Sequence, residues 1–223
     1  MPLILPGNVA TATAPTAYSI ANSCRFDDGS STAMEKTIGT PTSQRKFTFS
    51  AWVKRGALTT GANQSIFSAG TTSSYSTFLE IFFIGADDKM NVYLNNDPSY
   101  HVSTNRVFRD ISSWYHICVI VDTEQGTDTN RLKLFINGVQ ETSFSSTGYP
   151  TEDYDIPALA SGEEFRVGSR TNDDARFFDG YIAEMVFLDG QVCAVTDFGE
   201  FDTDGSPTIW KPKDPSGLTF GNN

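Results

Sequence analysis

The chain has 223 residues, which is enough for one sizeable domain or two small ones. Its 27 Asp and Glu residues outnumber its 16 Lys and Arg residues, and the net charge of −11 excludes a surface that coats nucleic acid and a cationic peptide that lies on membranes. No apolar run approaches the roughly 20 residues that span a bilayer, so we expect no membrane insertion. With 17 Phe, 8 Tyr, 18 Gly and 10 Pro residues, the composition favours strands and tight turns and predicts an all-β fold.

The N-terminal segment is apolar only over Met1–Leu5 (MPLIL). It carries no basic residue, and its apolar run is too short for a secretion signal. The small and β-branched residues of Gly7–Ala17 suit an extended chain. Residues 1–17 are therefore predicted to form an extended arm, which is either a flexible leader or an arm whose Leu3–Leu5 docks on a neighbouring subunit.

Apolar and polar side chains alternate along the middle of the chain with the period of two that is typical of β-strands. In Lys46–Arg55, for example, Phe47 and Phe49 share one face with Ala51 and Val53. Comparable segments are 78–84, 89–95, 114–122, 131–137, 165–168 and 181–188. About ten short strands separated by polar turns predict two packed antiparallel sheets.

Some of these predicted strands are apolar on both faces. Residues 78–84 (FLEIFFI) carry a single charged side chain, that of Glu80, and residues 114–122 (WYHICVIVD) are apolar over most of both faces. A strand in a sandwich needs only one buried face. We therefore expect the second face to line a groove or to be covered by a loop, a tail or a partner, and the long polar segment 141–164 is a candidate cover.

Four stretches of the sequence form a pattern when they are taken in order. They are SCRFDDG (23–29), FTFSAWVKRG (47–56), the pair WYHICVIVD and LKLFING (114–122 and 132–138), and GYIAEMVFLDG (180–190). This pattern resembles the concanavalin A-like (laminin G-like) jelly roll over about residues 18–200. The resemblance implies an all-β, two-sheet antiparallel jelly-roll sandwich of the concanavalin A-like lectin/glucanase type over residues 18–200. Residues 201–223 are predicted to form a C-terminal tail.

A narrower resemblance concerns the combination of RFDDGSS, AWVKRG, GYIAEMVFLDG and TDFGEFD. It is similar to lectin-like domains in bacteriophage virion proteins, especially fibres and other appendages of marine phages. This narrower resemblance implies that the tail, residues 201–223, leads toward a further downstream region. The resemblance implies a virion structural protein of a tailed phage, made in the host cytoplasm, which serves as a fibre or appendage subunit or as a capsid-surface decoration. Such a protein would contact other virion proteins and copies of itself, as a homo-oligomer such as a trimer, and would attach to host surface glycan.

Two other functions stay open at this point: a carbohydrate-binding module of a glycan-degrading enzyme, and a glycosidase or polysaccharide lyase. Retaining glycoside hydrolysis needs two carboxyl groups about 5–5.5 Å apart, for which an E-x-D-x-E-like run on one strand is the expected signature. The nearest match, Glu152–Asp155, lies in a predicted polar loop. His116 is predicted to face inward with Trp114, and His101 lies in a predicted loop without a neighbouring carboxylate. We therefore expect a binding protein rather than an enzyme.

Calcium is the one cofactor for which the sequence offers candidate ligands. The candidates are Asp87 and Asp88 in one predicted loop and Asn172, Asp173 and Asp174 in another. Oxygen donors on loops at one end of a sandwich can converge on Ca²⁺, and the resemblance to laminin G-like domains implies an ion at the rim. The alternative is that these side chains are exposed turn residues. The three cysteines lack CxxC spacing, which argues against a zinc site.

Sugar binding needs an aromatic platform together with planar amides or carboxylates. The candidates near one predicted sheet edge are Tyr75, Tyr93, Asn95, Asn96 and Tyr100. An all-β protein rich in Tyr and Asn also shows such clusters by chance, so this set stays a hypothesis at the level of the sequence.

Overall fold

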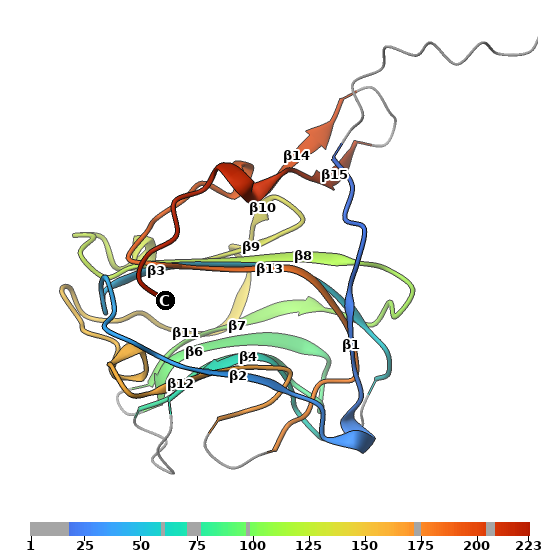
Figure 1. The fold of residues 1–223 in the computed structure, drawn as a ribbon, viewed down its shortest axis with the longest axis horizontal. Coiled ribbons are helices and arrows are strands. Elements are labelled where there is room, and N and C mark those ends of the chain that lie inside the picture. Colours follow the sequence, from blue (N-terminus) through green and yellow to red (C-terminus); the bar gives the residue numbers. More distant parts are fainter. Residues whose placement is uncertain (1–17, 59–60, 71–76, 97–98, 172–174, 204–207) are drawn as a thin grey trace, which may run out of the picture.

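The computed structural model describes residues 18–58, 61–70, 77–96, 99–171, 175–203 and 208–223. Two antiparallel sheets pack face to face as the layers of a sandwich (Figure 1). The helical segments in these ranges are single 3₁₀ turns, and none is long and apolar enough to cross a membrane. The predicted all-β architecture with two antiparallel sheets is confirmed. The predicted arm, residues 1–17, lies outside the described residues.

The described strands of residues 64–107, of 115–140 and of 144–167 each belong to one sheet, and the other connections of the sandwich cross between the two sheets. The six-stranded sheet has the order β1 (Cys24–Phe26), β13 (Gly180–Asp189), β3 (Lys46–Arg55), β8 (Tyr115–Asp122), β9 (Leu132–Ile136) and β10 (Val139–Gln140). The seven-stranded sheet has the order β11 (Phe144–Gly148), β7 (Ser99–Val107), β6 (Lys89–Asn96), β5 (Leu79–Phe83), β4 (Gln64–Ala69), β12 (Glu164–Val167) and β2 (Met34–Thr37). A separate hairpin pairs β14 (Gly199–Asp202) with β15 (Ile209–Pro212). The 3₁₀ turns are η1 (Asp28–Ser30), η2 (Asp128–Asn130), η3 (Pro157–Leu159), η4 (Val195–Asp197) and η5 (Pro215–Gly217).

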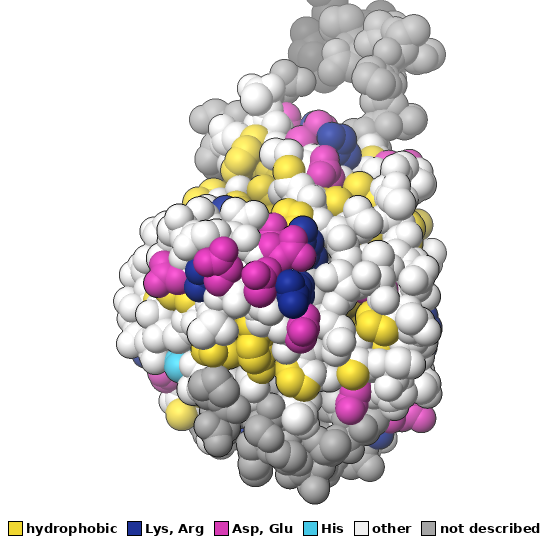
Figure 2. All heavy atoms as spheres, turned by 90° about the vertical axis from the view of Figure 1, so that its left-hand side faces the viewer, with side chains coloured by type: hydrophobic (Ala, Val, Ile, Leu, Met, Phe, Trp, Pro, Cys, Tyr) yellow, Lys and Arg dark blue, Asp and Glu magenta, His cyan; other side chains and the backbone are white. Residues whose placement is uncertain are grey.

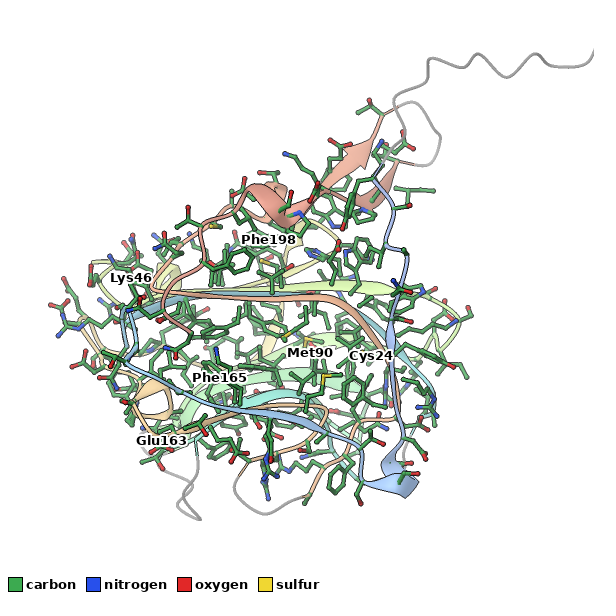
Figure 3. All side chains as sticks on the ribbon, in the orientation of Figure 1. Cys24, Lys46, Met90, Glu163, Phe165 and Phe198 are labelled. Carbon is green, nitrogen blue, oxygen red and sulfur yellow. The ribbon has the colours of Figure 1, made fainter. Side chains whose placement is uncertain are left out.

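The main core lies between the two sheets. The alternation predicted for β3 places Phe47, Phe49, Ala51 and Val53 in this core. Figure 3 shows Met90 and Phe165 pointing into the space between the layers from the seven-stranded sheet. Burial of a large apolar side chain contributes about 1.5–3 kcal/mol, so this layer of aromatic and aliphatic residues supplies most of the driving force for folding.

A second apolar cluster covers the outer face of the six-stranded sheet. Cys118, Ile120, Val186 and Leu188 of β8 and β13 pack there against Val195, Phe198 and Trp210. Figure 3 shows Phe198 on the opposite side of this sheet from the main core. The cover of the doubly apolar strand β8 is therefore the C-terminal segment, which we define as residues 195–223. The predicted cover, 141–164, instead supplies edge strand β11 and packs Tyr149 and Tyr154 against the main core.

The C-terminal segment is held on the sandwich at several points. Trp210 of β15 packs over the turn between β9 and β10, where Gly138 has a φ of +77° and an added Cβ would lie 2.2 Å from the indole ring. The backbone amide of Asn222 donates to the Thr42 hydroxyl at 2.9 Å. The Asn223 side chain accepts from the amide of Gly39 at 2.6 Å. Residues 208–223, which were predicted as part of a tail, are thus packed against the sandwich.

Strands β4, β7 and β11 lie where the sequence predicted no strand. The sequence of β7, SYHVSTNRV, is mostly polar and sends Val102 into the main core, so its pairing with β6 and β11 fixes a conformation that its own pattern indicates only weakly. His101, predicted to lie in a loop, is part of this strand.

Acidic and basic side chains gather at the end of the sandwich that faces the viewer in Figure 2. Arg45 bridges the carboxylates of Asp153 and Asp155, with N–O distances of 3.0 and 2.7 Å, and Lys46 pairs with Glu124. Glu152 pairs with Arg131 at 3.6 Å, so the acidic loop 152–155, which was the nearest sequence match to a catalytic pair, uses its three carboxylates in ion pairs.

Candidate functional site

A hollow of about 280 Å³ lies on the outer face of the seven-stranded sheet, the face that is turned away from the main core. Its lining consists of Asn63, Phe78, Phe82, Ile84, Asn91, Tyr93 and Arg176. We call this site the polar hollow. Its volume is close to the lower end of the range for small-ligand sites, about 300–1,000 Å³, so it has the size for one or two small polar rings.

Alternation along two central strands brings polar and aromatic side chains together in this hollow. The odd-numbered residues of β5 and the even-numbered residues of β6 enter the main core. Glu80 and Phe82 of β5 and Asn91 and Tyr93 of β6 therefore face outward. Phe82 pairs with Asn91 and Glu80 pairs with Tyr93 across the two strands, so the four side chains form one patch.

Aromatic rings form a continuous stack across β5, β6 and β7. The Tyr93 ring lies nearly parallel to that of Phe82, with centroids 5.9 Å apart, and stacks on the His101 imidazole at 5.1 Å. The guanidinium of Arg176 lies over the Phe82 ring, 5.1 Å from its centroid. Two serine hydroxyls fix His101 at distances of 2.8 and 2.9 Å. The stack gives the hollow a preorganised apolar wall with polar tips.

Beneath this wall lies a buried ion pair. Glu80 is fully buried, and its Oε2 accepts a hydrogen bond from Nη1 of Arg176 at 2.8 Å. Burial raises the pKa of Glu80 from 4.5 to about 7, against the opposing effect of the cations Arg176 and Arg170. The charge of this pair is therefore sensitive to pH near neutrality.

Asn91 carries a hydrogen-bond acceptor without a protein partner. The residue is 6% exposed and lines the polar hollow, and its Oδ1 makes no hydrogen bond. Buried polar atoms are almost always paired, because an unpaired group loses its hydration without compensation. A ligand hydroxyl that enters the hollow would supply the missing donor.

The structure separates the residues that the sequence grouped as a sugar site. Of the side chains in this set that the structure describes, Tyr93 alone lines the polar hollow. A β-bulge shifts the register between Tyr93 and Asn95, and the Asn95 amide donates instead to the hydroxyl of Tyr154. Tyr100 packs edge-on against the same Tyr154 ring at 4.8 Å. Neither Asn95 nor Tyr100 lines the hollow.

The two other residues of that predicted set are Tyr75 and Asn96, whose side chains the structure does not describe. Tyr75 lies outside the described residues, and Asn96 is described through its backbone pairing with Ser99. The sequence analysis missed Asn63, Phe82, Asn91 and Arg176, and it noted Glu80 only as the single charge in an apolar run. That charge was a usable signal, because a carboxylate on a doubly apolar strand requires a buried partner.

The calcium candidates that the structure describes are engaged by cations. The Asp88 carboxylate pairs with Arg55 and Arg109, each at 3.0 Å, and Asp87 pairs with Lys89 at 2.9 Å. Calcium would compete with these cations for the carboxylate oxygens, and its binding there stays a prediction. Across the described ranges, no group of three His, Cys, Asp or Glu side chains is arranged to hold a metal ion.

The second half of the calcium prediction, Asn172, Asp173 and Asp174, lies outside the described residues. It stays a prediction.

Ser50 and His116 form a hydrogen-bonded pair under the C-terminal segment, with Oγ and Nε2 2.9 Å apart. Both are buried, and burial lowers the pKa of His116 to about 4, so its imidazole is neutral. The predicted burial of His116 is confirmed, but its neighbours are Trp52 and Trp210 on the outer face of the six-stranded sheet. Trp114, which was predicted to face inward beside it, is 37% exposed. The pair is closed off from solvent and is a packing feature.

An apolar hollow of about 310 Å³ lies between residues 20–23 and β15. Trp52 and Trp114 line it together with Ala183 and Pro212. It offers few polar groups that could orient a ligand, whereas the polar hollow combines aromatic rings, amides and a guanidinium. We therefore take the polar hollow as the candidate functional site.

Comparisons with known proteins agree with the fold. The family described as the concanavalin A-like lectin/glucanases superfamily matches residues 27–193. The comparison with curated proteins finds no match. Among solved structures, the CBM40 of a Ruminococcus gnavus IT-sialidase, bound to α2,3-sialyllactose, is similar with a TM-score of 0.53 and 16% identity, over 74% of this chain and 95% of that chain. Domain 4 of the extracellular GH43 arabinanase AbnA from Geobacillus stearothermophilus, in complex with arabinotriose, is similar with a TM-score of 0.51 and 23% identity, over 72% and 68% of the two chains.

Proposed function

Because this chain belongs to the concanavalin A-like lectin/glucanases superfamily, we propose that it binds a glycan in the polar hollow on the outer face of the seven-stranded sheet. The observation that carries the proposal is the unpaired Oδ1 of Asn91, which is buried and lines a hollow with an aromatic wall. A sugar ring has one apolar face and a rim of hydroxyl groups that both donate and accept hydrogen bonds. It therefore matches the lining of this hollow.

The lining of the polar hollow supplies both kinds of contact that a sugar ring makes, apolar contact and hydrogen bonds. Phe78, Phe82 and Tyr93 provide apolar contact, while Asn91 and Arg176 offer an acceptor and donors. The two solved structures named above were determined with bound oligosaccharides, which supports a glycan as the ligand class.

We infer binding without turnover. Among the described residues, one carboxylate, that of Glu80, lies beneath the polar hollow, and it is paired with Arg176. Retaining hydrolysis requires a second carboxyl group about 5–5.5 Å away across the scissile bond. The lining of the hollow contains amides and aromatic rings in the positions around Glu80.

A glycan array with the purified protein tests this function. We expect binding that is lost in Tyr93→Ala and Asn91→Ala and kept in Tyr181→Ala, a matched aromatic substitution on the six-stranded sheet. The same array with EDTA shows whether Ca²⁺ contributes, and release of reducing ends from the bound glycan measures turnover. Glycan binding that survives both substitutions would show that the polar hollow is not the binding site. Release of sugar at a steady rate would contradict binding without turnover.

The second part of the proposal concerns the larger assembly to which this domain belongs, which we call its setting. The stretches RFDDGSS, AWVKRG, GYIAEMVFLDG and TDFGEFD support a subunit of a tailed-phage virion, made in the host cytoplasm and assembled with copies of itself and other virion proteins. On this setting the hollow attaches the particle to host surface glycan. Mass spectrometry of purified particles and antibody labelling in negative-stain images test the setting. Absence of the chain from intact particles would contradict it.

The other candidate setting is a carbohydrate-binding module of a glycan-degrading enzyme. It is favoured by the two similar structures, which are a module of a sialidase and a domain of an arabinanase. A catalytic domain in the same polypeptide would support this candidate. Both settings use the same binding chemistry in the polar hollow, so the array experiment applies to either.

A further inference from the structure

Glu80 is the charged group closest to the centre of the seven-stranded sheet, yet it is out of reach of any ligand. Its side chain has no exposed surface. Its Oε2 accepts a hydrogen bond from Nη1 of Arg176, which lines the polar hollow, and it lies opposite Tyr93 in the sheet. The hydrogen-bonded link between Glu80 and the lining of the hollow is therefore this guanidinium.

Several contacts hold Arg176, whose backbone is strained. Its φ is +58°, a conformation that residues other than glycine rarely adopt. The backbone carbonyl of Arg176 accepts a hydrogen bond from the amide of Ser65 at 2.8 Å, which ties this segment to β4. The side chain is held by Glu80 and by the face of Phe82. Of these contacts, the one with Glu80 is the charge-assisted contact and the one that a proton can weaken.

The groups that face Glu80 in the described residues come from three elements. The segment after β12 contributes the cations Arg170 and Arg176, and β6 contributes Tyr93. Strand β4 contributes uncharged serines, among them Ser68 opposite Glu80 in the sheet. Glu80 is therefore the acid of this buried cluster, and its pKa of about 7 places its ionisation in the physiological range.

We propose that Glu80 is the positioning residue of the polar hollow: its carboxylate holds the Arg176 guanidinium in the wall, so that glycan affinity follows the charge of a side chain that no ligand contacts. This inference rests on the proposed glycan-binding function. It goes further by naming Glu80 as the residue that positions the Arg176 guanidinium for binding and by predicting that glycan affinity falls in acid.

Two readouts test the proposal, of which one needs no ligand. The first is hydrogen exchange at the Ser65 amide, whose acceptor is the Arg176 carbonyl, corrected for the intrinsic pH dependence of exchange and followed from pH 8 to pH 5. The second is the affinity for the array-selected glycan over the same range. The variants are Glu80→Gln, which keeps the shape and removes the charge, and the control Glu35→Gln, an exposed carboxylate on β2 of the same sheet.

In the wild type and in Glu35→Gln, we expect protection of Ser65 to fall below pH 7 and the affinity to drop about tenfold for each pH unit below that value. In Glu80→Gln, both should be low at pH 8 and independent of pH. Equal pH profiles of Ser65 protection in the wild type and Glu80→Gln would overturn the positioning role. A pH-dependent Ser65 amide without binding of any glycan by the wild type would instead remove the proposed function and leave the positioning intact.

Discussion

Both outer faces of the sandwich are formed by strands with many apolar residues, but one face is covered by the chain and the other is open. On the six-stranded sheet, the outward residues of β8 and β13 include Cys118, Ile120, Val186 and Leu188, and the C-terminal segment buries this apolar set under Phe198 and Trp210. On the seven-stranded sheet, the outward residues of β5 and β6 include a carboxylate, an amide and a tyrosine, and they open into the polar hollow. The apolar residues are thus buried under a cover on one face and line the polar hollow on the other.

The difference between the faces lies in how their polar groups are satisfied. On the covered face, the His116 imidazole is neutral and hydrogen-bonded to Ser50. On the open face, Glu80 keeps a cationic partner and Asn91 keeps an unpaired acceptor. Both faces contain unpaired buried atoms, because Nδ1 of His116 and Nε1 of Trp210 also lack partners, but the Oδ1 of Asn91 is the one that lies in the lining of the polar hollow.

The largest expected effect comes from removing the anchor of the covered face. Trp210→Ala should lower the free energy of unfolding by about 3–5 kcal/mol, because the indole fills the space over Gly138 and Gly199. Urea denaturation measures this change. Tyr93→Ala, a half-buried aromatic on the open face, is the matched control and should cost clearly less. Equal losses in the two variants would contradict the division of roles between the faces.

Acid should weaken the covered face through His116. Its pKa falls from 6.5 in the unfolded chain to about 4 in the folded protein, so the stabilisation is complete above pH 6.5 and is lost as the pH falls toward 4. The shift corresponds to about 3 kcal/mol. Unfolding free energies at pH 7, 5.5 and 4 measure it, with His116→Gln as the variant in which this contribution disappears. An unchanged pH dependence in the variant would show that another group is responsible.

A smaller effect is expected at the turn that receives Trp210. Gly138→Ala places a Cβ at a positive φ and against the indole ring, so it should cost about 2 kcal/mol or more. Gly126→Ala is the control, because an added Cβ there meets no atom within 4 Å and its φ is not positive. Thermal unfolding compares the two variants. Similar melting temperatures would indicate that the turn and the indole are not packed as described.

The smallest effect on stability, and the largest on binding, is expected at Asn91. Because its Oδ1 has no partner in the protein, Asn91→Ala should change the free energy of unfolding by less than about 1 kcal/mol. Affinity for the selected glycan should fall at least tenfold. Isothermal titration with a parallel melting curve separates the two quantities. A variant that unfolds readily but still binds would reverse the roles assigned to this residue.

Alternation and the four family-like stretches were enough to predict the two-sheet architecture and the inward face of β3. The mostly polar strand β7 was not predictable in this way, because its conformation depends more on its neighbours β6 and β11 than on its own pattern. The strands that are apolar on both faces predicted that their second face is either covered or lines a groove. The choice between a cover and a groove depends on contacts between residues far apart in sequence, such as Trp210 with Gly138, which the pattern does not show.

The same limit applied to the candidate site. Tyr93 was found because aromatic residues on strands are visible in the sequence, but a bulge separated it from Asn95, and bulges leave little trace in the pattern. Arg176 lies 96 positions away from its partner Glu80, so only the fold could join them.

The most direct test of the central claim maps the bound glycan by amide chemical-shift perturbation in the ¹⁵N-labelled protein. The account predicts that the perturbed amides cluster around the polar hollow, on β5 and β6 and near Asn63 and Arg176. Perturbations confined to the apolar hollow at Trp52 and Trp114, with the outer face of the seven-stranded sheet unchanged, would contradict it.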